Sequence, residues 1–189
     1  TQGYSSAASD VYKRQVYMDA VFYPNIYQHE EIFRQEGWSY KMDSLEDDLA
    51  YNGVVYNEMK GAFSSPEGVL DRVVLNTLFP DTSYANESGG DPEVIPELTY
   101  EQFLDFHRRY YHPSNSYIYL YGNMDMEEKL NWLDQEYLSK FDYAPVDSKI
   151  RYQEPFDKVI EKEMPYSIAS DESEEDNTCL LYTSPSPRD

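Results

Sequence analysis

The sequence predicts an α+β fold in which helices pack on a mixed or antiparallel sheet. Two kinds of local pattern support this prediction. Several segments place helix-capping residues directly before runs with helical spacing, whereas Trp38–Met42 and Ser116–Tyr121 alternate apolar and polar residues as strands do. Because most elements are helical and the second strand lies between two late helices, the helices are expected to form a layer on the sheet.

The first part of the chain is expected to contain three helices around one strand. Val16–Tyr23 has the pattern of a helix end, and Gln28–Glu36 that of a short helix. After the strand at 38–42, Ser44 can cap a longer helix that runs from about Leu45 to Ala62. Gly53 falls inside this helix, where it costs up to about 1 kcal/mol relative to alanine.

The later helices have clearer start signals. Ser65 precedes a proline, Thr99 forms a capping-box pattern with Gln102, and Asp125 precedes a run with helical spacing. These signals predict helices at about 65–78, 99–110 and 125–139. A turn-rich loop at 79–92 joins the first two, and the chain after Pro145 has a polar, extended composition.

Composition limits the possible partners. The 189 residues include 36 acidic and 15 basic side chains, which gives a formal net charge of −21. This charge argues against nucleic acid and anionic membranes as partners, because both would be repelled. No apolar run is long enough to span a bilayer, and the single cysteine, Cys179, cannot form a disulfide framework.

Both ends of the chain are expected to be tails derived from sequencing adapters, at 1–15 and 179–189. One DNA sequence that encodes residues 10–15, "DVYKRQ", has a reverse complement that encodes residues 179–184, "CLLYTS", in a shifted frame. This element is similar to the transposon end used in sequencing adapters. The protein segment itself is therefore expected to run from about Val16 to about Thr178, and coding DNA unlike that element would overturn this interpretation.

Glu58 lies in the mostly apolar stretch "GVVYNEMKGAF" at 53–63. On a helix, Val54 lies four residues before this glutamate, Val55 three before and Ala62 four after. These positions share one face, which is expected to point into a core. An unpaired buried carboxylate costs several kcal/mol. We therefore expect Glu58 to be exposed at the edge of the apolar face, paired with another group, or bound to a ligand.

The histidines do not form a recognisable metal motif. His107 and His112 are five residues apart, which on a helix points them roughly 140° away from each other. Together with His29, they are expected to be surface or packing residues. No Ser-His-Asp or Cys-His arrangement is convincing, so the residues alone indicate one unusually placed glutamate and no complete catalytic site.

Three blocks of sequence carry a resemblance to a known family. They are "QEGW" at 35–38, "VVYNEMKGAFSSPEGVL" at 54–70 and the long block from "LFPDTSYANESGGDP" to "SYIYLYGN" at 78–123. In this order they resemble insulinase-type zinc metallopeptidases, and within that family the presequence protease branch. The similarity extends from about Tyr17 to Phe141.

The resemblance implies a role for Glu58. In that family two histidines of an inverted His-x-x-Glu-His motif and a glutamate on a later helix hold zinc, and Glu58 matches the later glutamate. The His-x-x-Glu-His motif is absent here, so no catalytic residue is identified and the segment is expected to be inactive alone. Residues 16–145 would form the distal part of an incomplete N-terminal catalytic domain, and 146–178 a linker and the start of the next insulinase-like domain.

The intact protein is then expected to be a Zn²⁺-dependent endopeptidase that degrades peptides, with basic peptides favoured by the acidic surface. Its expected compartment is the bacterial cytoplasm, or an organelle matrix in a eukaryote. Two alternatives remain open. The chain could belong to a non-catalytic structural subunit of the same family, or to an unrelated acidic peptide-binding module that uses Tyr117, Tyr119 and Tyr121 as a contact face.

Overall fold

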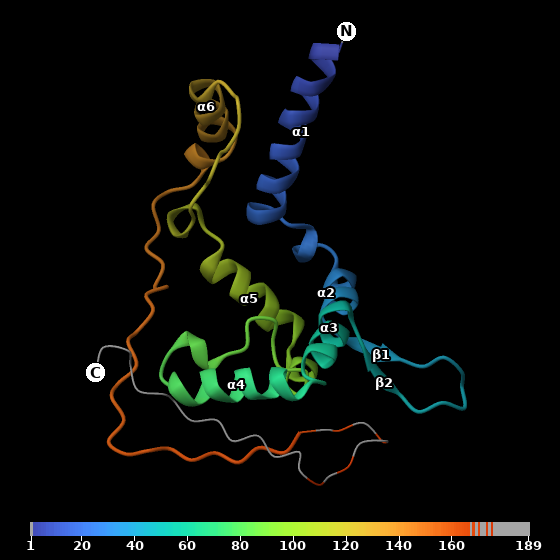
Figure 1. Cartoon of the computed structure of the whole chain (residues 1–189). Helices are drawn as coiled ribbons and strands as arrows, with labels where there is room; N and C mark the ends of the chain where they lie inside the picture. Colours follow the sequence, from blue (N-terminus) through green and yellow to red (C-terminus); the bar gives the residue numbers. More distant parts are fainter. Residues whose placement is uncertain (1, 167, 169, 171–172, 174, 176–189) are drawn as a thin grey trace.

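The computed structural model describes residues 2–166, 168, 170, 173 and 175 (Figure 1). This part of the chain contains six α-helices and one two-stranded antiparallel sheet, which confirms the α+β class. The helices are α1 (Gln2–Phe22), α2 (Glu30–Glu36), α3 (Val54–Ala62), α4 (Pro66–Leu78), α5 (Tyr100–Tyr110) and α6 (Met126–Glu136), and the strands are β1 (Ser39–Lys41) and β2 (Ala50–Asn52).

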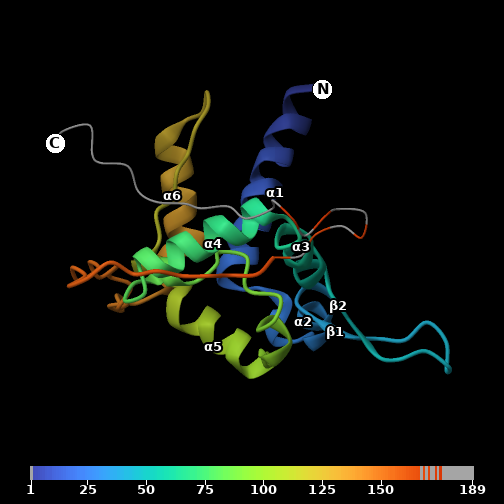
Figure 2. The ribbon, with the colours of Figure 1, turned by 60° about the horizontal axis from the view of Figure 1, so that its bottom comes forward.

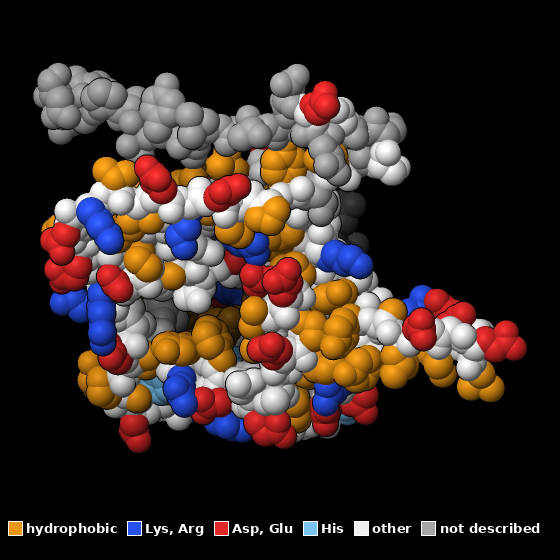
Figure 3. Space-filling view, turned by 90° about the horizontal axis from the view of Figure 1, so that it is seen from below, with side chains coloured by type: hydrophobic (Ala, Val, Ile, Leu, Met, Phe, Trp, Pro, Cys, Tyr) orange, Lys and Arg blue, Asp and Glu red, His pale blue; other side chains and the backbone are white. Residues whose placement is uncertain are grey.

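The helices form two groups that α5 connects. Helices α1 and α6 lie at one end of the molecule, and α2, α3 and α4 lie at the other (Figure 1). The β1–β2 hairpin projects away from the body, and the chain after α6 runs past α5 and then along α4 (Figures 1 and 2). In Figure 3, acidic side chains are spread over the visible face, which has a hollow near its centre lined by apolar side chains.

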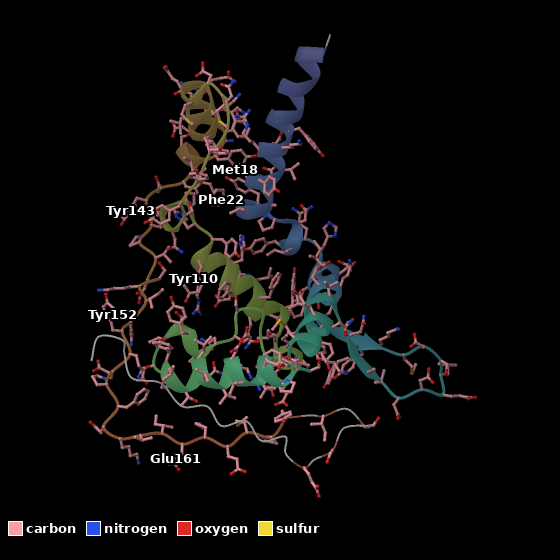
Figure 4. The ribbon with its side chains drawn as sticks, viewed as in Figure 1. Met18, Phe22, Tyr110, Tyr143, Tyr152 and Glu161 are labelled. Carbon is pink, nitrogen blue, oxygen red and sulfur yellow. The ribbon has the colours of Figure 1, made fainter. Side chains whose placement is uncertain are left out.

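The α1–α6 contact forms the main apolar cluster of the described residues. Met18 and Phe22 of α1 pack against Leu133 of α6 and against Tyr137, which directly follows α6. Figure 4 shows Met18 and Phe22 pointing towards α6. The helix predicted at 16–23 is therefore present. Its start differs from the prediction, because the helix continues back to Gln2 through the part of the chain assigned to the first tail.

The predicted N-terminal caps of the later helices are all present. The Ser65 hydroxyl accepts a hydrogen bond from the backbone of Gly68 at 3.0 Å, and Asp125 accepts one from Glu128, also at 3.0 Å. The Thr99 side chain and the Gln102 side chain exchange hydrogen bonds with each other's backbone amides. These contacts satisfy amide groups that the helix itself leaves without partners, so they determine where α4, α5 and α6 begin.

The helix predicted from Leu45 to Ala62 is wrong over its first half. Residues 39–41 and 50–52 instead pair as an antiparallel hairpin, in which Tyr40 lies opposite Tyr51. The two rings stack with centroids 5.4 Å apart, and Trp38 meets both edge-on. Cross-strand aromatic contacts of this kind stabilise a hairpin, and they outweigh the weak helical signal of the polar residues at its tip.

Gly53 lies at the junction between β2 and α3 and not inside the helix. A Cβ atom built on Gly53 would lie 2.2 Å from the carbonyl oxygen of Gly37. The backbones approach so closely that only glycine fits at this position. The amide of Tyr56, in the first turn of α3, also donates to the Gly37 carbonyl at 3.3 Å.

The strand predicted at Ser116–Tyr121 is not formed within the described residues. Tyr117, Tyr119 and Tyr121 are exposed, and Leu120 packs against the α1–α6 cluster. Ile118, which the alternation places on the face opposite the tyrosines, is also exposed. A strand needs a neighbour to pair with its backbone, and the described part of the chain supplies none here.

The chain after residue 140 has neither helix nor strand through residue 166. This agrees with the polar, extended composition after Pro145. Residues 176–178 and the tail assigned to 179–189 lie outside the described residues. None of the helices that the structure describes is long and apolar enough to cross a membrane.

The candidate metal-ligand site at Glu58

Helix α3, which carries Glu58, is fixed at both ends. At its start, the Gly53–Gly37 approach holds it against the end of α2, and the Asn57 side-chain amide donates to the Asn52 side chain at 3.0 Å. At its end, the guanidinium of Arg72 lies 4.3 Å from the centre of the Phe63 ring. The candidate ligand is therefore carried by a helix whose position neighbouring elements determine.

Arg72 also ties the turn-rich loop at 79–92 to this region. Its guanidinium donates to the Asp91 carboxylate at 2.8 Å, and both side chains are partly buried. No pairing of Arg72 with Asp91 was predicted from the sequence. The "GGDP" turn at 89–92 was the available signal, because an aspartate after two glycines can reach outward from a fixed turn.

The face of α3 that enters the core is not the predicted one. Met59 is buried, with only 8% of its surface exposed, and Gly89 of the loop packs directly against its sulfur atom. In contrast, Val54, Glu58 and Ala62 are all exposed, and Val55 is half-buried. The prediction that their shared face points into a core is wrong, because α2 and the loop at 79–92 cover the Met59 side of the helix.

Glu58 accordingly has the environment of an exposed carboxylate beside apolar residues. It forms no hydrogen bond or ion pair with any other residue that the structure describes. Of the three arrangements considered from the sequence, exposure at the edge of an apolar face is the one observed in this chain. The carboxylate is thus free to accept a ligand, and no burial penalty opposes its charge.

The described residues do not complete a metal site. No group of three or more His, Cys, Asp or Glu side chains lies close enough together in this part of the chain to hold an ion. Zinc in proteins takes three or four protein ligands, most often histidine and cysteine with occasional carboxylates. Glu58 can supply one such ligand, and nothing described near it supplies the others.

None of the three histidines lies near a set of metal-binding side chains in the part of the chain that the structure describes. His107 on α5 is 9% exposed, and its Nε2 donates to the carbonyl of Val21 at 2.8 Å. Its Nδ1 forms a hydrogen bond with the Tyr27 hydroxyl at 2.7 Å. His112 accepts a bond from the Ser114 amide at 3.1 Å, and His29 directly precedes α2.

The described residues thus form an α+β arrangement with one exposed glutamate at the predicted position and no complete metal site. Comparison with known proteins identifies the family. Residues 97–189 match the family model described as "Peptidase M16 inactive domain", a span that crosses the domain boundary expected near 145.

Several relatives match over most of the chain. The chain is 57% identical over 168 residues to "Protein HypA" of Clostridium perfringens, and this alignment covers 89% of the chain and 17% of the relative. The chain is 45% identical over 147 residues to "Presequence protease 1, chloroplastic/mitochondrial" of Arabidopsis thaliana, an alignment that covers 77% of the chain and 14% of the relative. It is 48% identical over 145 residues to "Presequence protease, mitochondrial" of Drosophila melanogaster, with 74% of the chain and 14% of the relative covered.

These matches confirm the recognition made from the sequence blocks. The chain is an insulinase-type, M16-family sequence related to the presequence proteases. It spans 14–17% of the length of these relatives. The activity of a whole protein of this kind is therefore a matter for proposal.

Proposed function

We propose that residues 16–178 are a segment of a zinc-dependent metalloendopeptidase that degrades peptides, and that Glu58 is one of its zinc ligands. The observation that carries this proposal is the exposed, unpartnered carboxylate of Glu58 on a helix braced by Gly37 and Arg72. A carboxylate with no internal ion pair keeps its oxygens available to a metal ion.

The segment itself is proposed to be inactive, because the described residues provide a single ligand. In the whole protein, zinc would polarise the peptide carbonyl and lower the pKa of a bound water. The part assigned to Glu58 is to hold the metal with its negative charge, and not to act as the general base. The remaining ligands would come from other parts of the whole protein, because the Clostridium perfringens relative is about six times as long as residues 16–178.

The proposed partners are peptides, with basic peptides favoured. The net charge of −21 attracts cations, and an acidic surface can raise association rates by roughly 10–10³ at low salt. Neither nucleic acid nor a membrane is proposed as a partner. The proposed compartment is the cytoplasm for a bacterial protein, or an organelle matrix for a eukaryotic one, as in the names of the mitochondrial and chloroplastic relatives.

A second candidate function is a non-catalytic subunit of the same family. The description of the matching family model as an inactive domain favours it. The two candidate functions make different predictions for Glu58. A peptidase needs its carboxylate to hold zinc, whereas a structural subunit has no need for a free carboxylate at this position.

The experiment uses the protein encoded by the uninterrupted reading frame that contains residues 16–178. Its cleavage of a basic peptide is measured for the unchanged protein, for Glu58→Gln and for Glu67→Gln. Glu67 is an exposed glutamate at the start of α4, so its variant is a matched control. We expect Glu58→Gln to abolish cleavage and Glu67→Gln to leave it unchanged. Full activity of Glu58→Gln would contradict the proposed role, and an inactive, zinc-free unchanged protein would favour the structural subunit.

A further inference from the structure

A cavity of about 500 Å³ lies between α5, the loop after α4 and the extended segment 147–151, which we call the strap. Glu58 does not line it. Phe106 and Tyr110 of α5 contribute its aromatic side, with ring centroids 4.8 Å apart. In Figure 4, Tyr110 lies at the end of α5 that faces the extended chain carrying Tyr152. The volume lies within the range typical of small-molecule sites, about 300–1,000 Å³.

The strap is tied to the body near both of its ends. On one side, the Ser148 hydroxyl donates to the Asn115 side chain at 2.6 Å. On the other, Gln153 and Asp81 form two hydrogen bonds, from the Gln153 side-chain amide to the Asp81 carboxylate at 2.6 Å and from the Asp81 backbone amide to Gln153 at 3.0 Å. The cavity wall is therefore held by specific polar contacts although the strap has no regular secondary structure.

The strap carries charges of both signs into the cavity wall. Lys149, Arg151 and Asp147 line the cavity, and none of them forms an ion pair with another residue in the described part of the chain. The Arg34 and Arg109 guanidiniums, in contrast, lie 2.7 and 2.6 Å from carboxylate partners.

We propose that this cavity binds a short peptide through its free carboxyl terminus. Lys149 and Arg151 would bind the terminal carboxylate, because the arginine fork matches two carboxylate oxygens. The Phe106–Tyr110 pair would pack against the apolar side chain of the last residue, and Asp147 would accept hydrogen bonds from the terminal ammonium group. The choice of a peptide rests on the proposed function, but the binding expected at this site does not depend on Glu58 or zinc.

The first test measures the dissociation constant of the dipeptide Ala-Phe for the 189-residue chain by calorimetric titration. We expect the double change Lys149→Gln and Arg151→Gln to weaken binding at least tenfold. The matched control is Lys158→Gln with Lys162→Gln, which removes the same charge from exposed positions of the same extended chain outside the cavity. Equal weakening by both pairs, or no binding at about 10 mM peptide, would overturn the proposal.

A second test changes the ligand. Ala-Phe with an amidated carboxyl terminus should bind the unchanged chain at least tenfold more weakly, and the Lys149/Arg151 variant should no longer distinguish the amide from the acid. Equal binding of both peptides by the unchanged chain would show that no carboxylate is recognised, and would overturn the proposal.

A third test concerns the aromatic side. Phe106 is 58% exposed, so Phe106→Ala should leave the fold intact, which circular dichroism can verify. This variant should lose the preference for Ala-Phe over Ala-Ala, and a retained preference would contradict the assignment. Glu58→Gln should bind Ala-Phe like the unchanged chain, so failure of this site and failure of the proposed zinc ligand can be distinguished.

Discussion

The Tyr137 hydroxyl donates a 2.7 Å hydrogen bond to the Asp19 carboxylate, which joins the chain just after α6 to α1. Tyr137 is only 4% exposed, and it belongs to the apolar cluster between these helices. Burial raises the pKa of the Tyr137 phenol well above its ordinary value of 10.0, and the hydrogen bond and negative charge of Asp19 raise it further. The contact therefore depends on the phenol keeping its proton.

This contact predicts a loss of stability at alkaline pH. The pKa of Tyr137 is higher in the folded chain than in the unfolded one. The contribution of this phenol to the stability of the fold is therefore fully present below about pH 10, and it is lost as the pH rises through the folded pKa. Tyr137→Phe should lower the free energy of unfolding by about 1 kcal/mol at pH 7. Urea unfolding of the unchanged chain and of Tyr137→Phe at several pH values checks both expectations. A difference in the free energy of unfolding between the two that stays constant up to about pH 11 would contradict the account.

The cluster between α1 and α6 predicts a contrast between two leucines of one helix. Leu133 is 3% exposed, whereas Leu130 is 54% exposed. Leu133→Ala should therefore lower the free energy of unfolding by about 2–5 kcal/mol through lost burial and a cavity. Leu130→Ala should change it by less than about 0.5 kcal/mol. Similar losses for the two variants would mean that α6 does not pack on α1 by this face.

Two glycines of the Glu58 region make a second matched pair. A Cβ at Gly53 would lie 2.2 Å from the Gly37 carbonyl oxygen, whereas a Cβ at Gly61 would meet nothing within 4 Å. Gly53→Ala should thus destabilise the chain by about 1–3 kcal/mol through overpacking, and Gly61→Ala should be neutral or stabilising by up to about 1 kcal/mol. Thermal unfolding measures both, and a neutral Gly53→Ala would argue against the close approach of α2 and α3.

The sequence predicted best those features that a few neighbouring residues determine. The starts of α4, α5 and α6 follow from capping contacts within three residues, such as Ser65 to Gly68. The hairpin was missed because its pairing joins residues 39–41 to 50–52 across a polar tip that could equally begin a helix. The strand at 116–121 was predicted from alternation alone, which supplies no partner for its backbone.

At the candidate site, too, the features that depend on contacts between distant residues were not predicted from the sequence. Residue blocks resembling a known family identified Glu58 as a ligand candidate, whereas helical spacing placed its face in the core. The spacing argument failed because it cannot tell which side of α3 the other elements cover. That side is set by Gly89 against Met59, a contact across thirty residues of chain. The cavity beside the strap was likewise beyond the sequence, because it depends on contacts between distant segments such as Asp81 and Gln153.

The proposed role of Glu58 is tested most directly by the zinc affinity of the whole protein from the uninterrupted reading frame. Competition with a chelator gives this affinity for the unchanged protein, Glu58→Gln and Glu67→Gln. Loss of a direct ligand should weaken zinc binding more than the roughly 10- to 100-fold typical of residues that only orient a ligand. We therefore predict a loss of more than about 100-fold for Glu58→Gln and none for Glu67→Gln. Equal zinc affinity for the unchanged protein and Glu58→Gln would contradict the central claim.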